Sequence, residues 1–125
     1  MKSVQHAYSA AALRCIDRIN KLGEVEQQQY GSLCHRFPSM VMLNGLRLTV
    51  AFFSVDKGMR NTFLHDLEQA LGVENLAENM PERMDDYRDL TRRALAAAVW
   101  FKRYAEAVLG ITQGEAADVE AEELL

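Results

Sequence analysis

The chain has 125 residues, 49% of them apolar, with only seven glycines and two prolines. This composition excludes a wholly disordered chain and favours one domain built from long helices over a fold of many short strands. Residues 1–60 carry eight Lys or Arg against four Asp or Glu, and residues 61–125 carry six against fourteen, for a formal net charge of −4. Because local patches decide binding, this acidic balance does not exclude a nucleic-acid partner.

Two cysteines and the N-terminal segment indicate where the protein is located. Cys15 and Cys34 lie in helical patterns without a CxxC or Cys/His cluster, so we expect buried, reduced thiols and no metal site. No apolar run has the length of a transmembrane helix or the form of a signal peptide. The sequence predicts a cytoplasmic protein with no membrane partner.

Apolar spacing predicts the first two helices. From Val4 to Leu22, apolar residues recur in steps of three and four, which places them on one helical face. A second helix is expected from Val25 to Arg36, because Pro38 should interrupt it.

The next segment, "MVMLNGLRLTVAFF" (residues 40–53), allows two interpretations. Asn44-Gly45 between apolar runs is a strong hairpin signal. Helical spacing nevertheless connects four apolar residues across it: Leu43, Leu46, Val50 and Phe53. Asn and Gly inside a helix would together cost about 1–2 kcal/mol relative to alanine. We favour a helix that continues through Asn44-Gly45, with the hairpin as the alternative.

The C-terminal half predicts two further helices. They span residues 61–71 and 83–109, with a loop at 73–82 between them. The fold class is therefore all-α, a compact bundle of about five helices with a long C-terminal helix. We expect a single domain over residues 1–110 and an acidic tail over residues 111–125, with five acidic residues and no basic one.

Basic residues follow two of the predicted helix faces, next to small or apolar residues. The first face combines Ala7, Ala10, Arg14, Arg18 and Lys21, and the second combines Arg88, Arg92, Ala96, Val99 and Arg103. Such a face lets a phosphate backbone approach closely. The alternative is a solvated face whose charges are paired by Asp17, Asp89 and Glu106.

Other charged and aromatic residues have two interpretations each. Arg47 lies in the most apolar segment, so its guanidinium must reach the surface, a partner or a buried acid. Lys57 follows that segment and would complement a helix C-terminus. Trp100 and Tyr104 are one helical turn apart, which suits packing in a core or interface, with base stacking as the alternative.

One weak catalytic pattern is present. Arg60 and His65 match the Arg-x4-His spacing of a class of dimeric helical ribonucleases. His6 and His35 have no nucleophile or ligand partner nearby in the sequence, and there is no glycine-rich phosphate loop. We expect no catalytic residue, no cofactor and no small-molecule substrate.

Two separated motifs resemble a known family. They are "NGLRLTVAFF" (residues 44–53), followed by Lys57, and "YRDLTRRALAAAVWFKRYAEA" (residues 87–107). Together they resemble the small helical subunit of the type III-B CRISPR effector, the Cmr RAMP module, over roughly residues 4–109. The matching positions are Asn44, Gly45, Leu46, Thr49, Ala51, Phe52, Lys57, Tyr87, Thr91, Trp100, Lys102, Arg103, Tyr104, Ala105 and Glu106.

The resemblance implies a non-enzymatic small subunit for antiviral defence, an α-helical bundle whose copies stack beside the backbone subunits of a ribonucleoprotein. Its partners would be the other Cmr-module subunits, further copies of itself, and the guide and target RNA. The expected contacts with the RNA backbone are Arg14, Arg18, Lys21, Arg47, Lys57, Arg92, Lys102 and Arg103. Structural roles are expected for Asn44, Gly45 and Trp100, with Asn-Gly inside a core helix and Gly45 admitting a second helix at close range.

Two alternative functions remain beside this one, a dimeric ribonuclease that uses Arg60 and His65, and a helical adaptor that binds only proteins. The acidic tail could also mimic a polyanion and screen the basic faces of the free subunit. Deletion of residues 111–125 would then strengthen RNA binding.

Overall fold

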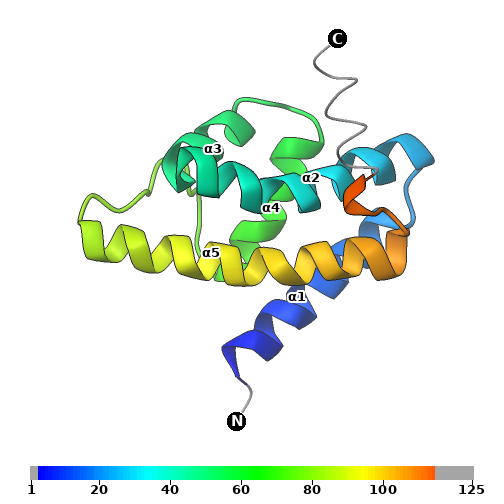
Figure 1. Ribbon diagram of the computed structural model, residues 1–125, viewed down its shortest axis with the longest axis horizontal. Coiled ribbons are helices and arrows are strands. Elements are labelled where there is room, and N and C mark those ends of the chain that lie inside the picture. Colours follow the sequence, from blue (N-terminus) through cyan, green and yellow to red (C-terminus); the bar gives the residue numbers. More distant parts are fainter. Residues whose placement is uncertain (1–2, 115–125) are drawn as a thin grey trace.

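The fold consists of helices, as the computed structural model shows for residues 3–114, the part of the chain that it describes (Figure 1). Five α-helices and a short π-helix follow one another in this part, and no strand occurs within it. They are α1 (Val4–Ile19), α2 (Glu24–Asn44), α3 (Leu46–Ser54), α4 (Met59–Leu71), α5 (Met84–Tyr104) and η1 (Ala105–Leu109). The expected all-α bundle with a long C-terminal helix is confirmed.

The long helix α5 organises the bundle. It lies along the longest axis of the molecule and packs against α1, α2 and α4 (Figure 1). In Figure 1, α2 and α3 lie above α5 and α1 crosses behind it, while α4 packs against both α1 and α2. Each helix therefore has one face against the core and another available to solvent.

The core is built around the ring of Phe63 on α4. It makes edge-on or tilted contacts with four other buried rings, at centroid distances of 5.3–5.8 Å. These rings belong to Tyr30, Phe37, Phe53 and Phe101, so α2, α3 and α5 meet on α4 at one point. Such aromatic pairs contribute about 0.5–1.5 kcal/mol each beyond the burial of their area.

The prediction that Pro38 interrupts the second helix is wrong. α2 continues through Pro38 as far as Asn44. A proline inside a helix costs about 3 kcal/mol, because it removes one backbone hydrogen bond and crowds the preceding turn. Phe37 and Val41, on either side of it, are 1% and 3% exposed. Their burial contributes about 1.5–3 kcal/mol each and offsets that cost.

Both interpretations of Asn44-Gly45 are also wrong. The chain neither turns back as a hairpin nor continues as one helix, because α2 ends at Asn44 and α3 begins at Leu46. Gly45 between them has φ +83° and ψ 161°, a backbone conformation that is essentially restricted to glycine. The glycine is needed for this change of direction between two helices that both pack on the core.

The chain folds back onto α2 after α5. Ile111 is only 4% exposed, and a Cβ added to Gly31 would lie 2.5 Å from its Cδ1 atom. The Nε2 atom of buried His35 donates a hydrogen bond to the Ile111 carbonyl oxygen at 2.8 Å. The packed region therefore extends at least one residue beyond the expected boundary at 110, while residues 115–125 of the tail lie outside the described part.

Candidate nucleic-acid interface

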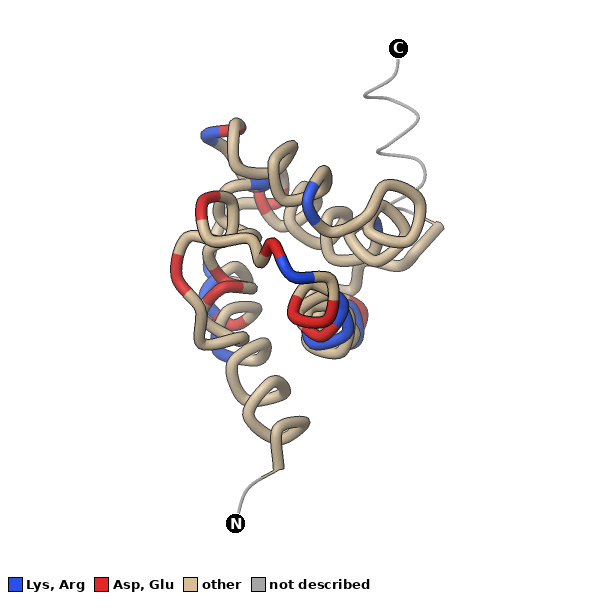
Figure 2. The backbone as a smooth tube through the Cα atoms, turned by 90° about the vertical axis from the view of Figure 1, so that its left-hand side faces the viewer, with Lys and Arg blue, Asp and Glu red and all other residues tan. Residues whose placement is uncertain are grey.

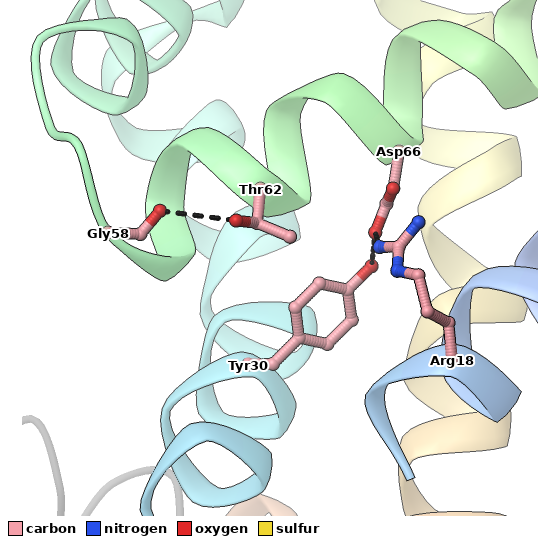
Figure 3. Close-up of polar contacts among 5 residues, drawn as sticks. All are labelled: Arg18, Tyr30, Gly58, Thr62 and Asp66. Carbon is pink, nitrogen blue, oxygen red and sulfur yellow. Dashed lines mark hydrogen bonds and ion pairs between the residues drawn. The ribbon is translucent and has the colours of Figure 1, made fainter. Parts of the chain in front are cut away.

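Of the three basic residues on the first predicted helix face, Arg18 has a partner in the core. Its guanidinium donates to the carboxylate of Asp66 at 2.5 Å, and the Tyr30 hydroxyl donates to the same oxygen at 2.6 Å (Figure 3). The Asp66 side chain is 3% exposed, whereas that of Arg18 is 50% exposed. Arg18 thus neutralises a buried carboxylate and joins α1 to α4, while half of its surface still faces solvent.

The buried groups around Asp66 are held in their neutral forms. Burial raises the pKa of the Cys15 thiol to about 12, and the nearby Asp66 carboxylate adds to the rise. Burial likewise raises the pKa values of Tyr30 and Cys34 well above their usual ranges. Both thiols therefore stay protonated near neutral pH, which makes them poor nucleophiles and poor metal ligands.

Arg47 at the start of α3 is joined to α5. Its guanidinium lies 5.3 Å from the ring centroid of Tyr87 and donates to the Pro81 carbonyl oxygen at 3.1 Å. Its backbone N–H donates to the Tyr87 hydroxyl at 3.0 Å. The same hydroxyl would lie 3.3 Å from a Cβ at Gly45. The two sequence motifs, 40 residues apart, therefore meet where α3 begins.

The C-terminal end of α5 carries a stacked cation. The guanidinium of exposed Arg103 lies 4.8 Å from the ring centroid of Trp100, which stacks in turn on Tyr104 at 6.2 Å. The Trp100 indole donates to Gln5 at 2.7 Å, and the Tyr104 hydroxyl lies 2.7 Å from that of Ser9. Trp100 and Tyr104 thus attach α5 to α1, and they support Arg103 at the surface.

The two basic faces do not form one surface. On α1, Ser9 contacts α5 and Arg18 contacts α4. The two residues are nine positions apart. At about 100° per residue they lie on opposite sides of that helix. Figure 2 shows the same separation, with the basic positions of α1 at the left of the molecule and those of α5 at the right of that helix. A polyanion on one face would leave the other face free.

The remaining predicted contacts are surface residues. Arg92 lies 3.6 Å from the Asp89 carboxylate, with its side chain 76% exposed. The other remaining predicted contacts form no ion pair within residues 3–114: Arg14, Lys21, Lys57 and Lys102. The first three are exposed and Lys102 is partly buried. Asn44, expected to have a structural role, is exposed at the end of α2.

The weak catalytic pattern is not assembled within the chain. Arg60 stacks over the Phe52 ring at 4.7 Å, and His65 lies 3.2 Å from the carboxylate of Glu68. The residues are five positions apart on α4, so their side chains point about 140° apart around the helix. Across the described residues, no group of three His, Cys, Asp or Glu could hold a metal ion. None of the described helices is long and apolar enough to span a membrane.

Two partners of these arginines were missed by the sequence analysis. Asp66 has a signal in the sequence, since it lies beside Phe63 and Leu67 on the inward face of its helix, where an acid needs a partner. Tyr87 belongs to a recognised motif, but its contact with Arg47 depends on how α3 and α5 pack. No pattern in the sequence predicts that packing.

Comparisons with known proteins agree with this fold. Residues 4–108 match the family model of the CRISPR-associated protein Cas_Cmr5. The CRISPR system Cmr subunit Cmr5 of Thermus thermophilus is 35% identical over 86 residues, which cover 65% of this chain and 75% of that protein.

A solved structure has the same fold. It is the X-ray crystal structure of a CRISPR-associated Cmr5 family protein from Thermus thermophilus, with a TM-score of 0.78 and 30% sequence identity. The alignment covers 86% of this chain and 98% of that one. The family identified from the two motifs is therefore confirmed, and this chain belongs to the CRISPR-associated Cmr5 family.

Proposed function

We propose that this chain is a small, non-catalytic subunit of a type III-B Cmr ribonucleoprotein complex that acts in the cytoplasm. The observation that carries the proposal is the family match over residues 4–108, together with a relative described as the CRISPR system Cmr subunit Cmr5. The partners are the other Cmr subunits, further stacked copies of this chain, and the guide and target RNA.

RNA contact on this proposal is electrostatic and independent of sequence, because phosphate contacts position a protein without reading bases. The C-terminal end of α5 is the strongest candidate, since Arg103 is exposed and supported by the Trp100 ring. Lys102 lies beside it without an ion pair among residues 3–114. The N-terminal half of α5 is less basic, because Arg92 lies close to Asp89 there.

The other face contributes separately. Arg14 on α1, Lys21 after the end of α1 and Lys57 after α3 keep an exposed charge for phosphate contact. Arg18 and Arg47 contribute less, because a carboxylate and an aromatic ring already share their guanidinium groups. Because the two basic faces are separated, each would bind its own partner. The partners would be two RNA segments, or an RNA segment on one face and a neighbouring subunit on the other.

The test is a charge reversal in the assembled complex. Arg103→Glu should lower the affinity for target RNA about tenfold at moderate salt, and it should reduce the slope of log affinity against log salt by about one to two. The matched control is Arg83→Glu, because Arg83 is 81% exposed before the other end of α5 and lies 3.9 Å from Asp86. Equal affinities of the Arg103→Glu complex and the unmodified one would contradict RNA contact at this end.

A second assay tests the non-catalytic role. The isolated subunit should leave single-stranded RNA intact during a long incubation. The ribonuclease alternative would be supported by cleavage that is lost in His65→Ala, a substitution of an exposed side chain. Cleavage that persists in that variant would be assigned to a contaminant, and absence of cleavage supports the proposal.

A further inference from the structure

The short helix α3 is apolar on two sides. Its outer face repeats apolar residues at helical spacing, with Leu48 60%, Phe52 43% and Val55 79% exposed. Its inner face lies in the core through three side chains that are each no more than 1% exposed: Leu46, Val50 and Phe53. A helix that is apolar all round is normally covered by other parts of a protein. No other part of residues 3–114 covers the outer face of α3.

The exposed apolar area continues onto the end of α2, where Met42 and Leu43 are 75% and 83% exposed. We define the α3 surface by its five exposed apolar residues: Met42, Leu43, Leu48, Phe52 and Val55.

The charged residues around the α3 surface are mostly basic. Arg47 lies in the first turn of α3, and Lys57 follows the end of that helix. Arg60 stacks over the Phe52 ring and lies 3.9 Å from the Asp56 carboxylate. These three basic residues and one acidic residue give a net charge of +2. Two further residues follow the carbonyl that Arg47 contacts, and their opposite charges cancel: Glu82 and Arg83.

The connection between α1 and α2 has the complementary character. We define the α1–α2 turn as residues 21–26, in which Leu22 and Val25 are 42% and 66% exposed. Lys21 is the one basic residue in it. Two acidic residues lie in the first turn of α2: Glu24 and Glu26. The α1–α2 turn therefore combines exposed apolar side chains with a net charge of −1.

The two regions lie at opposite ends of α2. This helix has 21 residues, which corresponds to a length of about 30 Å. Figure 1 shows the α1–α2 turn at the right of the molecule and α3 at the upper left. A chain therefore cannot place its own α1–α2 turn on its own α3 surface, whereas a second copy can. The same contact can then repeat from copy to copy, because a contact between two different surfaces need not close.

We propose that the α3 surface of one copy receives the α1–α2 turn of the next copy. Leu22 and Val25 pack on the apolar side chains, and the acidic residues of the turn face Arg47 and Lys57. A two-fold contact between two α3 surfaces is disfavoured, because it would bring two surfaces of net charge +2 together. The inference rests on the proposed function, and it assigns the two surfaces through which stacked copies touch.

Disulfide trapping in the assembled Cmr complex tests this proposal. One chain carries both Val25→Cys, in the turn, and Ala51→Cys, which is exposed on the outer face of α3. Under a mild oxidant such as diamide, this chain should form a ladder of disulfide-linked dimers and larger multimers. Each single-cysteine variant should form no ladder, because it supplies only one half of the contact. Mass spectrometry identifies the joined peptides.

The matched control combines Val25→Cys with Ala7→Cys, an exposed position on α1. The ladder should form at least about tenfold faster with Ala51→Cys than with Ala7→Cys, because contact raises the effective thiol concentration. The native thiols interfere little, because Cys15 and Cys34 are buried and their pKa values are raised.

Two further variants of the Val25→Cys and Ala51→Cys chain test the apolar and the charged parts of the contact. Adding Leu48→Glu and Val55→Glu should lower the rate to that of the control. Adding Glu24→Lys should lower the rate about threefold, because it reverses the net charge of the turn. All three side chains are exposed, so these substitutions should leave the fold intact, and circular dichroism of the free subunit verifies this.

Three results would overturn the proposal. One is the absence of a ladder in a complex that native mass spectrometry shows to hold several copies. Another is a ladder whose rate the Leu48→Glu and Val55→Glu substitutions leave unchanged. The third is a dimer of the Ala51→Cys single variant, which would reveal a two-fold contact. Failure of the unmodified chain to co-purify with other Cmr subunits would instead contradict the proposed function itself, so the two failures are distinguishable.

Discussion

Arg18 and Arg47 were both predicted to contact phosphates, yet each joins helices within the chain in a different way. Arg18 is paired with Asp66, a carboxylate whose side chain is 3% exposed. Arg47 is exposed, and its partners are an aromatic ring and a carbonyl oxygen of neutral residues. The first arginine compensates a buried charge, and the second adds a contact that water could largely replace.

The comparison teaches that the buried partner decides how much an arginine matters for stability. An unpaired carboxylate in the core keeps its full desolvation penalty, whereas an unpaired carbonyl at the surface is hydrated. In the region around Arg47, the essential element is therefore Gly45 rather than the guanidinium. The following predictions test this difference.

The largest expected effect is in the Arg47 region, at Gly45. Gly45→Leu should lower the free energy of unfolding by about 3 kcal/mol, because a side chain is strained at φ +83° and ψ 161°. The Cβ would also lie 3.3 Å from the Tyr87 hydroxyl oxygen. Urea unfolding followed by circular dichroism measures the loss.

Two variants separate the backbone strain at Gly45 from the close contact with the Tyr87 hydroxyl. Tyr87→Phe removes the hydroxyl but leaves the backbone strain, so it should relieve only a minor part of the Gly45→Leu loss in the double variant. Gly110→Ala is the control for positive φ alone, because its φ is +71° with nothing within 4 Å of an added Cβ. It should cost about 1 kcal/mol. A stable Gly45→Leu variant would show that the junction tolerates another conformation.

The second largest loss of stability is expected for Arg18, and it is compared directly with the loss for Arg47. Arg18→Met keeps the length of the side chain but leaves the Asp66 carboxylate without its charged partner and with neutral partners such as the Tyr30 hydroxyl, at a cost of about 2 kcal/mol. Arg47→Met removes an exposed cation–π contact and one hydrogen bond, at a cost of about 0.5–1 kcal/mol. Urea unfolding measures both, with Arg14→Met as the exposed control on α1. Equal losses for Arg18 and Arg47 would refute the importance of the buried partner.

A smaller effect concerns pH and is confined to the Asp66 region. The Cys15 thiol has its pKa raised to about 12 in the folded chain, from 9.0 for an unperturbed thiol. Above pH 9 the unfolded chain therefore loses this proton before the folded chain does, so stability is complete below pH 9 and falls as the pH rises toward 12. The melting temperature should fall by about 3 °C more between about pH 8 and pH 10 for the native chain than for Cys15→Ala. Identical pH profiles would contradict the raised pKa.

The sequence predicted helices well where a single periodicity continued without interruption. The long C-terminal helix and the all-α class follow from apolar spacing, and two short motifs identified the family. Pro38 and Gly45 were misassigned because local propensity cannot weigh the burial of Phe37 and Val41 against the cost of a proline. The helix is therefore interrupted at Gly45 instead of at Pro38, because the backbone at Gly45 has a conformation that is essentially restricted to glycine.

For the candidate interface, the sequence located the basic residues but not their partners. The α1 and α5 faces were each recognised from spacing within one helix. The separation of these two faces depends on contacts between helices. Ser9 of α1 contacts Tyr104 of α5, and Arg18 of α1 contacts Asp66 of α4. Periodicity describes one helix at a time, so it cannot show whether two faces combine.

The smallest effect on stability is expected for a third arginine, Arg103. Its partner Trp100 is an aromatic ring at the surface, so Arg103→Gln should cost less than about 0.5 kcal/mol, below the loss for Arg47→Met. Removing the stacked cation should still change the indole emission, and Trp100 is the one tryptophan in the chain. Urea unfolding and fluorescence of the same samples measure both properties. A large loss of stability would place Arg103 with Arg18 as a structural residue, whereas an unchanged stability leaves its charge available for a partner outside the chain.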